Sequence, residues 1–473
     1  MEPARSEPKP GYFYVLFWGS LALMLVFATV FALERLNSDA GYYFFQTLNR
    51  CSLHVEHGRF VLALAEFPVW LGVILHAPLI FLVYLYSFTH VFFHFTLAWF
   101  CARRLGEYRV ALLIVLLQFV GLRESVFTPQ FELYYGITFS LSALALLRST
   151  VLIKPVIRWL LFSLAVFFGI TSHPYAILIL IFLLVFQKLQ TGKMPLPAYV
   201  FVIMELLLYI IWKKWMVSDY ESGKFNLFFD HLKNGEWKNV FQWQTLKSGL
   251  YLLVTYLLVS QVLFVSGIIS GLRIRRYRDT AWLLTGYAGM IFVAWNMFLP
   301  TYMDRYFEQV YFPVSVIAVS WLAFFPWQKW IVFLIPVVVL FQFAGMTDYG
   351  ISYKRRTEQM DYFVQKALAH KQQKAYVTEA SMGEMYAVGN WSYGFESLIL
   401  SQARYGKSIT ITKEEDLLFE DNIRKIKPDE YLFRQWEKVP YSWLNPVYFQ
   451  LSSGDYTVLQ VHKPVQVRKT FFP

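Results

Sequence analysis

Long apolar runs recur through the first three quarters of this chain. A membrane-spanning helix needs about 20 consecutive, mostly apolar residues, because the hydrocarbon core of a bilayer is about 30 Å thick. Of the 473 residues, 57% are hydrophobic and 16% are charged, whereas soluble domains carry about 25% charged residues. The pattern excludes a soluble globular protein and predicts an all-α, multi-pass membrane bundle of about eleven spans.

The loops between the apolar runs differ in charge. Lys and Arg collect at 103–104, 148–158, 188–193 and 273–278. Basic loops stay on the cytoplasmic side of a membrane, so we expect a cytoplasmic N-terminus. The loops expected outside are 34–78, 123–134, 213–249 and 300–309. Because the basic loops account for the net charge of +11, we expect membrane lipids as partners and no nucleic acid.

The chain divides into three parts by composition. Residues 1–11 are polar and proline-rich and are expected to be disordered, and residues 12–346 form the membrane domain. From 347 to 473 long apolar runs stop. Here one predicted helix face carries Met360, Phe363, Val364, Ala367 and Leu368, and strand-like alternation occurs at 407–412 and 456–461. We expect a small α/β domain of about 120 residues, which about eleven spans would place outside.

Asp39 is the first candidate for chemistry. It follows the first apolar run, 12–33, and begins the first outside loop. Ser38 and Asp39 could both simply cap a helix. The functional interpretation is a general base, since transfer to a hydroxyl needs a carboxylate near the acceptor oxygen. Carboxylates held at membrane level are costly and often mark function, so we favour the base.

Two arginines in outside loops are candidates for binding phosphate. Arg59 follows His57 and Gly58, and Arg305 precedes Tyr306 in a short loop. A guanidinium offers a planar fork of donors that matches phosphate oxygens. The alternative is anchoring at the membrane surface by a snorkelling side chain. Both lie opposite to the side that basic residues normally occupy, which weakens that alternative.

Other polar residues add candidates for binding a substrate. Glu124 and Glu132 share the second outside loop, and they could bind sugar hydroxyls, bind a metal or cap a helix. His173 precedes Pro174 between two short runs, and a lone histidine is more often structural than a ligand. His90 and His94 are spaced by four within one run, which favours a buried polar contact between spans.

Asp39 in the first outside loop, the His57-Gly58-Arg59 segment before a surface helix at 60–70, and the Arg305-Tyr306 pair together resemble GT-C-type glycosyltransferases. The resemblance covers 12–346. It implies a polyprenyl-phosphate-linked sugar donor, a glycan, lipid or protein acceptor, and inverting transfer on the extracytoplasmic face. Asp39 would then be catalytic. We expect a multi-pass protein of a bacterial inner membrane.

Cofactor use stays open. Metal-dependent members of that family often show an Asp-x-Asp pair in the first loop, whereas here Ala40 and Gly41 follow Asp39. No metal-binding residue is therefore assigned, and a divalent Mg or Mn ion stays an open alternative.

Two other functions fit a chain of this kind. A transporter or flippase needs charged groups at mid-membrane, where only Glu205 and the His173-Pro174 break qualify. A non-catalytic subunit of a cell-envelope glycan assembly complex would use the outside domain for binding. If the protein is an enzyme, we expect one outside cavity to be lined by Asp39, Arg59, Glu124 and Arg305.

Overall fold

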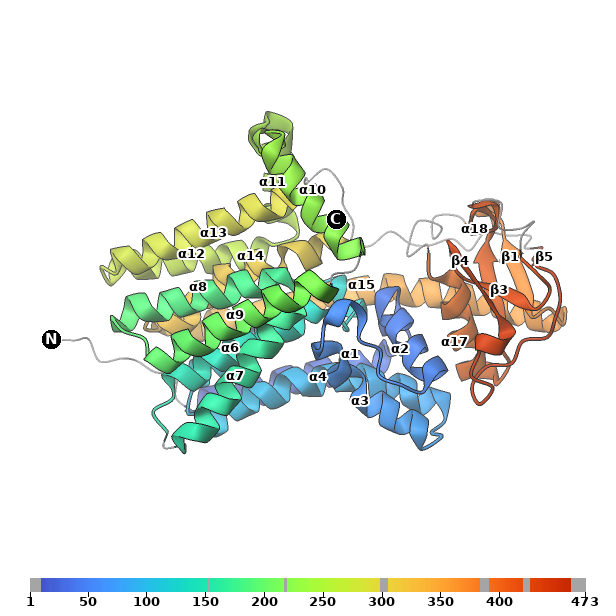
Figure 1. Ribbon diagram of the computed structural model, residues 1–473, viewed down its shortest axis with the longest axis horizontal. Helices are drawn as coiled ribbons and strands as arrows, with labels where there is room; N and C mark the ends of the chain where they lie inside the picture. Colours follow the sequence, from blue (N-terminus) through green and yellow to red (C-terminus); the bar gives the residue numbers. More distant parts are fainter. Residues whose placement is uncertain are drawn as a thin grey trace.

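The computed structural model of the protein describes residues 10–151, 153–216, 219–297, 305–382, 391–419 and 426–460. It is mostly helical. Helices of the membrane bundle run side by side along the long axis of the molecule, and a small unit with strands lies at one end (Figure 1). The bundle and this unit meet around the first loop of the chain, near α2.

Six helices are long and apolar enough to cross a membrane, or seven if one bent pair counts as a span. The six are α1 (Pro10–Val30), α4 (Leu79–Arg103), α7 (Pro155–Ser172), α8 (Pro174–Thr191), α9 (Leu196–Met216) and α15 (Lys329–Ala369). Their composition is that of a membrane protein. The bundle also contains α5 (Tyr108–Leu116), α6 (Glu132–Arg148), α12 (Leu258–Arg273), α13 (Tyr277–Met297) and α14 (Arg305–Phe324).

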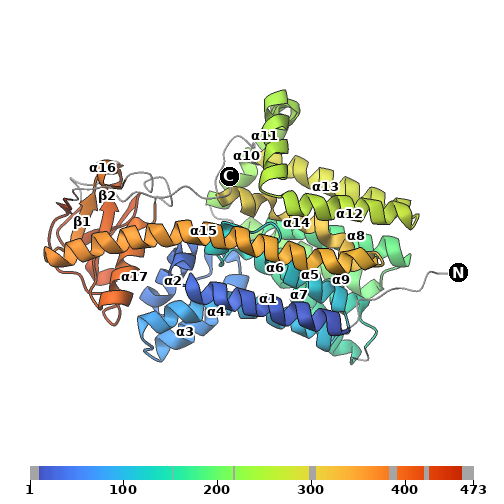
Figure 2. The ribbon, with the colours of Figure 1, turned by 180° about the vertical axis from the view of Figure 1, so that it is seen from behind.

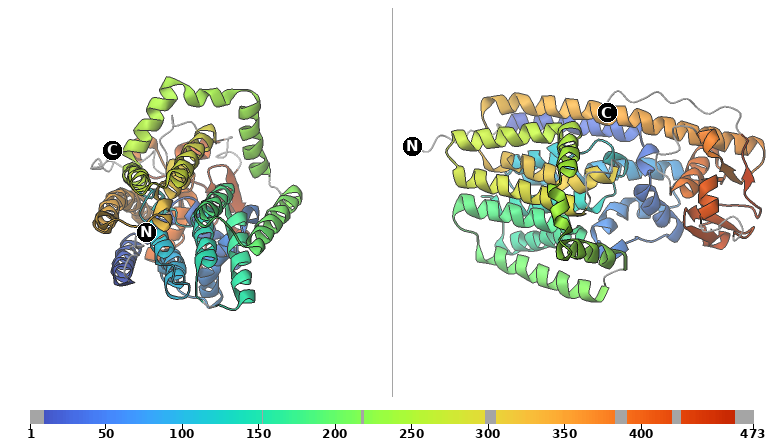
Figure 3. Two further views of the ribbon diagram at one scale, coloured as in Figure 1. Left: turned by 90° about the vertical axis from the view of Figure 1, so that its left-hand side faces the viewer. Right: turned by 90° about the horizontal axis from the view of Figure 1, so that it is seen from above.

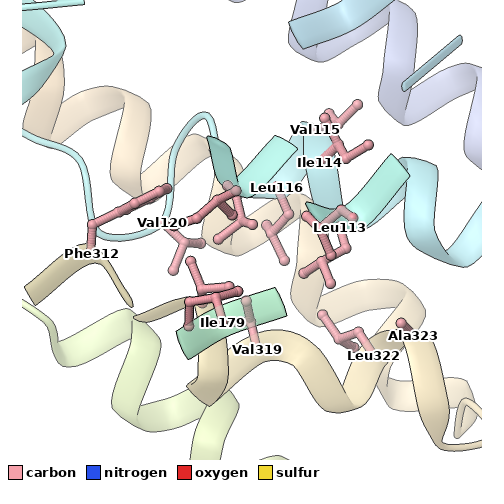
Figure 4. Packing of buried hydrophobic residues seen from close by; sticks show 14 of the residues in the cluster. Leu113, Ile114, Val115, Leu116, Val120, Ile179, Phe312, Val319, Leu322 and Ala323 are labelled. Atoms are coloured by element: carbon pink, nitrogen blue, oxygen red, sulfur yellow. The ribbon is translucent and has the colours of Figure 1, made fainter. Parts of the chain in front are cut away.

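The core of the bundle is a packed layer of aliphatic and aromatic side chains. Figure 4 shows residues of α5, such as Leu113 and Leu116, meeting Ile179 of α8 and Val319 of α14. Helix α5 ends at Leu116, although the mostly apolar sequence continues to Leu122. Gly121 follows with φ +80°, and a Cβ there would lie 2.7 Å from Ser315 Oγ. This close approach of the backbone to α14 favours glycine and a turn.

Two expected loops contain helices instead. Between Met216 and the next span lie α10 (Asp219–Lys233), the 3-10 helix η4 (Glu236–Phe241) and α11 (Trp243–Thr255). The apolar run at 250–272 does not form one straight helix, because α11 and α12 meet at 90°, and the bent pair counts as at most one span. Residues 305–309, expected in a loop, form the first turn of α14.

The first loop, 34–78, is largely helical as well. It holds the 3-10 helices η1 (Glu34–Leu36) and η2 (Glu56–Gly58), and the α-helices α2 (Asp39–Arg50) and α3 (Val61–Ile74). The helix expected at 60–70 exists as α3, which contains Pro68 and continues beyond 70 to Ile74. Neither α2 nor the 3-10 helices were predicted.

The C-terminal unit is joined to the bundle by a continuous helix. Helix α15 crosses position 346 without a break and runs into this unit, as Figure 2 shows. Its residues Met360, Phe363, Val364 and Ala367 are buried, which confirms the predicted helix face. They pack against a sheet of order β2-β1-β5, all parallel, built from β1 (Lys374–Val377), β2 (Thr410–Lys413) and β5 (Thr457–Val458).

The remaining elements of the unit surround this sheet. They are α16 (Glu379–Met382), α17 (Tyr393–Tyr405), α18 (Glu414–Leu418), the antiparallel pair β3 (Glu430–Arg434) and β4 (Glu437–Pro440), and η7 (Tyr441–Trp443). The register pairs Ala375 with Ile411 and with Thr457. The two strands expected from alternation therefore overlap β2 and β5.

Candidate functional site

Asp39 is the first residue of α2, and contacts from the C-terminal unit hold the backbone before it. Ser38 has φ +53° and ψ −121°, and its side chain does not cap α2. Its backbone N–H donates to Glu396 Oε1 of α17 at 2.8 Å. Ser38 as a capping side chain is thus wrong, and Asp39 begins a helix instead of lying in a loop.

One face of α2 gathers Asp39 with two tyrosines. Tyr42 and Tyr43 follow Asp39 by three and four residues, which puts all three on one side of the helix. The Tyr42 hydroxyl donates to Glu56 Oε1 at 2.7 Å, and the Tyr43 hydroxyl donates to Glu132 Oε1 at 3.0 Å. The tyrosines therefore link the first turn of α2 to two carboxylates from other elements.

Arg59 is paired in this structure. Its Nη1 lies 2.8 Å from Glu132 Oε1, the atom that also accepts from Tyr43, and Glu132 is almost fully buried. Glu132 is the first residue of α6. Two separate outside loops of the sequence thus supply one ion pair, and Arg59 would have to share Glu132 in order to bind a phosphate.

Glu56 accepts hydrogen bonds on a carboxylate that also lies beside two imidazoles. Its Oε1 accepts from Tyr42 and lies 3.1 Å from His54 Nε2, while its Oε2 lies 3.9 Å from His57 Nε2. Burial alone would raise the pKa of Glu56, but hydrogen bonds from His54 and Tyr42 and the nearby imidazoles lower it to about 2. Glu56 is therefore a fixed negative charge beside the tyrosines.

His173 and Lys213 lie on the bundle side of the same cluster. Lys213 Nζ donates to the His57 carbonyl at 2.9 Å. The His173 ring accepts from the Tyr175 backbone N–H at 3.1 Å and so caps α8. Burial lowers the pKa of His173 well below its usual value, and the charges of Arg59 and Lys213 lower it further. A neutral capping histidine matches the structural alternative for this residue.

Glu124 belongs to a second cluster. The Tyr353 hydroxyl of α15 donates to Glu124 Oε1 at 2.7 Å. Glu308 Oε2 of α14 accepts from three successive backbone N–H groups, those of Arg123, Glu124 and Ser125, at 2.8–2.9 Å. The 3-10 helix η3 (Ser125–Phe127) begins there. Glu124 is thus bound to α14 through its backbone and to α15 through its side chain.

The structure describes only the backbone of the Arg305-Tyr306 pair. Arg305 and Tyr306 are the first two residues of α14, three and two residues before Glu308. Their side chains, like the neighbouring Asp304, lie outside the described part of the chain. The expected convergence of Arg305 with Asp39 therefore stays a prediction.

Several residues of the cluster were not singled out from the sequence. Besides Tyr42, Tyr43 and Glu56, Glu66 of α3 is almost fully buried and accepts from the His54 N–H at 2.5 Å and from Gln130 Nε2 at 2.8 Å. Burial raises the pKa of Glu66 to about 8, against these hydrogen bonds. The sequence signal that could have identified Glu66 is its position as a single acidic residue within the apolar stretch 60–74.

The polar residues inside the bundle are paired across helices. His94 Nδ1 lies 2.8 Å from Thr138 Oγ1, and His90 Nδ1 contacts the Tyr135 hydroxyl, so the predicted polar contact between α4 and α6 is confirmed. Ser163 Oγ of α7 donates to Glu205 Oε1 of α9 at 2.7 Å. The charged group considered for a transport path thus has a partner on the neighbouring helix.

No group of three or more His, Cys, Asp or Glu residues suited to a metal ion occurs within the described ranges. Glu56 and Glu132 are instead matched with hydroxyl, imidazole or guanidinium partners. Dependence on Mg or Mn stays an open prediction. Comparisons with protein-family models, curated proteins and solved structures gave no match for this chain.

Proposed function

We propose that the protein is a membrane glycosyltransferase of GT-C-like architecture that uses a polyprenyl-phosphate-linked sugar. The observation that carries the proposal is the face of α2, where Asp39 lies one helical turn before Tyr43, and the Tyr43 hydroxyl donates to the Glu132 that pairs with Arg59. A carboxylate, hydroxyl donors and a guanidinium lie together beside a membrane bundle. Transfer from a lipid phosphate to a hydroxyl needs these groups.

In the proposed reaction, Asp39 accepts the proton of the acceptor hydroxyl. The acceptor oxygen forms a bond to the anomeric carbon as the bond from that carbon to the phosphate oxygen breaks. The polyprenyl phosphate leaves with its electron pair, and the configuration inverts. Arg59, and Arg305 at the start of α14, would neutralise the leaving phosphate, while Glu132 and Tyr43 hold Arg59 in place.

The finer architecture belongs to the same proposal. About eleven spans would place the C-terminal unit and the Asp39 cluster on the extracytoplasmic face of a bacterial inner membrane, with the N-terminus in the cytoplasm. The glycan, lipid or protein acceptor would approach from that side.

Replacement of Asp39 by Asn tests the proposal. The purified protein in vesicles is given a panel of polyprenyl phosphates linked to radiolabelled hexoses or pentoses, together with a membrane extract as the source of acceptor. Loss of a general base costs about 10²–10⁴-fold in rate, so Asp39→Asn should abolish transfer at an unchanged melting temperature. The matched control is Asp455→Asn, which changes an exposed aspartate of the C-terminal unit.

Near-normal transfer by Asp39→Asn would remove Asp39 from the mechanism. Movement of the intact labelled lipid across the vesicle, with no transfer by the unaltered protein, would favour a flippase. Binding of the labelled lipid with neither transfer nor movement would favour a non-catalytic subunit.

A further inference from the structure

Helix α11 presents apolar residues on two opposite faces. Thr245, Gly249, Leu252 and Leu253 form the buried face toward the protein. The opposite face is exposed, and its members are Trp243, Leu246, Leu250, Tyr251 and Val254. Trp243 is 77% exposed and Leu250 is 62% exposed. Five large apolar side chains on one face of a short helix are more than scattered surface residues, so this face has an apolar partner.

The neighbouring helix shows how α11 is oriented. α12 has an exposed stripe at Leu258, Val262, Val265, Ile269 and Leu272, the spacing of a lipid-facing side of a span. α11 meets α12 at 90°. If α12 runs across the bilayer, then α11 lies parallel to the membrane plane. Figure 3 shows α10 and α11 projecting sideways from the bundle at one end of α12.

Packing fixes α11 in this direction. A Cβ on Gly249 would lie 2.1 Å from Trp295 Cζ2, so the helix approaches α13 as closely as a glycine permits. The η4 segment continues the contact, since the ring centroids of Phe241 and Phe292 lie 6.4 Å apart. The exposed face of α11 is therefore held outward at a set angle to the bundle.

The residues around this face are those of a membrane interface. Trp237 and Phe241 of η4 are exposed beside it, and Lys238 Nζ lies 6.0 Å from the Trp237 ring centroid. Lys247 is exposed on α11 itself, next to Trp243 and Tyr251 on the helical wheel. Tryptophan and tyrosine collect at the level of lipid headgroups, and lysine stems extend along apolar surface toward phosphates.

We propose that α11 is an interfacial helix whose exposed face lies at the boundary between the headgroups and acyl chains of the bilayer. Trp243, Leu250 and Val254 enter the acyl boundary, and Lys247 reaches the phosphate layer. A helix of this kind binds through its buried apolar area together with attraction to lipid phosphates. The inference does not depend on the reaction that the protein catalyses.

Fluorescence quenching in vesicles tests the depth of α11. The full chain carries Cys51→Ser, and Leu250→Cys is labelled with an environment-sensitive fluorophore; Cys101 is buried. Vesicles of equal parts phosphatidylcholine and phosphatidylglycerol carry a nitroxide either near the headgroup or at the acyl-chain end. The comparison labels are Val262→Cys on α12, expected at depth, and Leu418→Cys on α18, expected in water; both positions are exposed.

We expect the Leu250 label to lose about half of its emission or more to the headgroup-proximal nitroxide and clearly less to the chain-end nitroxide. The Val262 label should show the reverse order, and the Leu418 label should respond to neither. Quenching of the Leu250 label in the order found for Val262 would overturn the proposal in favour of a spanning segment. So would no quenching at either depth. A Leu250 label that is shielded from both nitroxides at high protein density, and is quenched only after dilution to one copy per vesicle, would assign this face to a second copy instead.

Discussion

The two sides of α2 differ in how completely their polar groups are closed off. Toward the C-terminal unit, Glu396 accepts from the Ser38 N–H and pairs with Arg356 at 2.6 Å, and both charged side chains are buried. Toward η2 and α6, Glu56 and Arg59 remain partly exposed to solvent. The first side, the junction between α2 and the C-terminal unit, is closed off from solvent, whereas the second stays partly open to it.

The junction continues along the helix. Asn49 Nδ2 donates to the Trp443 carbonyl at 2.6 Å, and Asn445 N–H donates to Asn49 Oδ1 at 2.8 Å. The Phe45 and Phe449 rings stack with centroids 5.0 Å apart. The C-terminal unit therefore packs against α2 as far as Tyr42, whose ring centroid lies 6.0 Å from that of Phe433 and 4.8 Å from the Arg434 guanidinium carbon. The Tyr43 hydroxyl donates to Glu132 of the bundle instead. A residue with φ > 0, such as Ser38, persists only where its surroundings over-determine it.

Breaking the junction should have the largest effect on stability. Glu396→Ala leaves the Arg356 guanidinium buried without its carboxylate and removes the acceptor of the Ser38 N–H. Loss of one partner of a buried ion pair typically costs about 3–5 kcal/mol. The measurement is the melting temperature of the purified protein in detergent.

Arg404→Ala is the matched control for this change. Arg404 pairs with Asp361 at 2.9 Å in the same unit, but its side chain is 34% exposed, so we expect a loss of at most about 1 kcal/mol. Equal losses for Glu396→Ala and Arg404→Ala would show that the junction is no more important than a surface pair.

Glu66 should make the fold less stable as pH rises. Its pKa is about 8 in the fold and 4.5 in the reference state, so between these values the folded chain holds a proton that the unfolded chain has lost. The contribution of Glu66 to the free energy of unfolding is then fully present below about pH 4.5. It falls by up to about 1.4 kcal/mol per pH unit toward pH 8. Glu66→Gln cannot titrate and should flatten that slope in melting temperature.

Glu414→Gln, on an exposed carboxylate of α18, serves as the control and should leave the slope unchanged. A slope for Glu66→Gln that matches the unaltered protein would mean that Glu66 is ionised in the fold at neutral pH.

Glu56 should show the opposite and smaller pH dependence. Its pKa is lowered from 4.5 to about 2, so its contribution is present above pH 4.5 and is lost as pH falls through about 2. Because the side chain is 27% exposed, solvent screening reduces the effect, and we expect Glu56→Gln to cost about 1–2 kcal/mol at pH 6. The difference in melting temperature between the variant and the unaltered protein should be smaller at pH 3 than at pH 6, and a difference that grows in acid would contradict the assignment.

Much of the membrane bundle follows from the sequence alone. A run of about 20 apolar residues has to bury its backbone polar groups in a helix when it meets lipid, and the six candidate spans lie on such runs. The helix face of Met360 to Ala367 and the strands near 410 and 457 were also predictable, since periodicity is a local property.

Only part of the candidate site could be predicted from the sequence. Position and residue type made Asp39, Arg59, Glu132 and His173 candidates, but the sequence did not show that Arg59 would pair with Glu132. That contact joins residues 73 positions apart (132 − 59) and depends on how α6 packs beside η2. Likewise, α2 was missed because its burial comes from two partners, the bundle and the C-terminal unit.

The sequence by itself determined a helical membrane protein with charged loops and a polar C-terminal unit, because these depend on composition and short-range spacing. Tertiary structure alone decided that α11 turns 90° from α12 and that Glu396 holds the start of α2. It also decided that Glu56 and Glu66 have pKa values shifted in opposite directions. Such properties depend on burial and on partners that lie distant along the chain, and local spacing does not encode either.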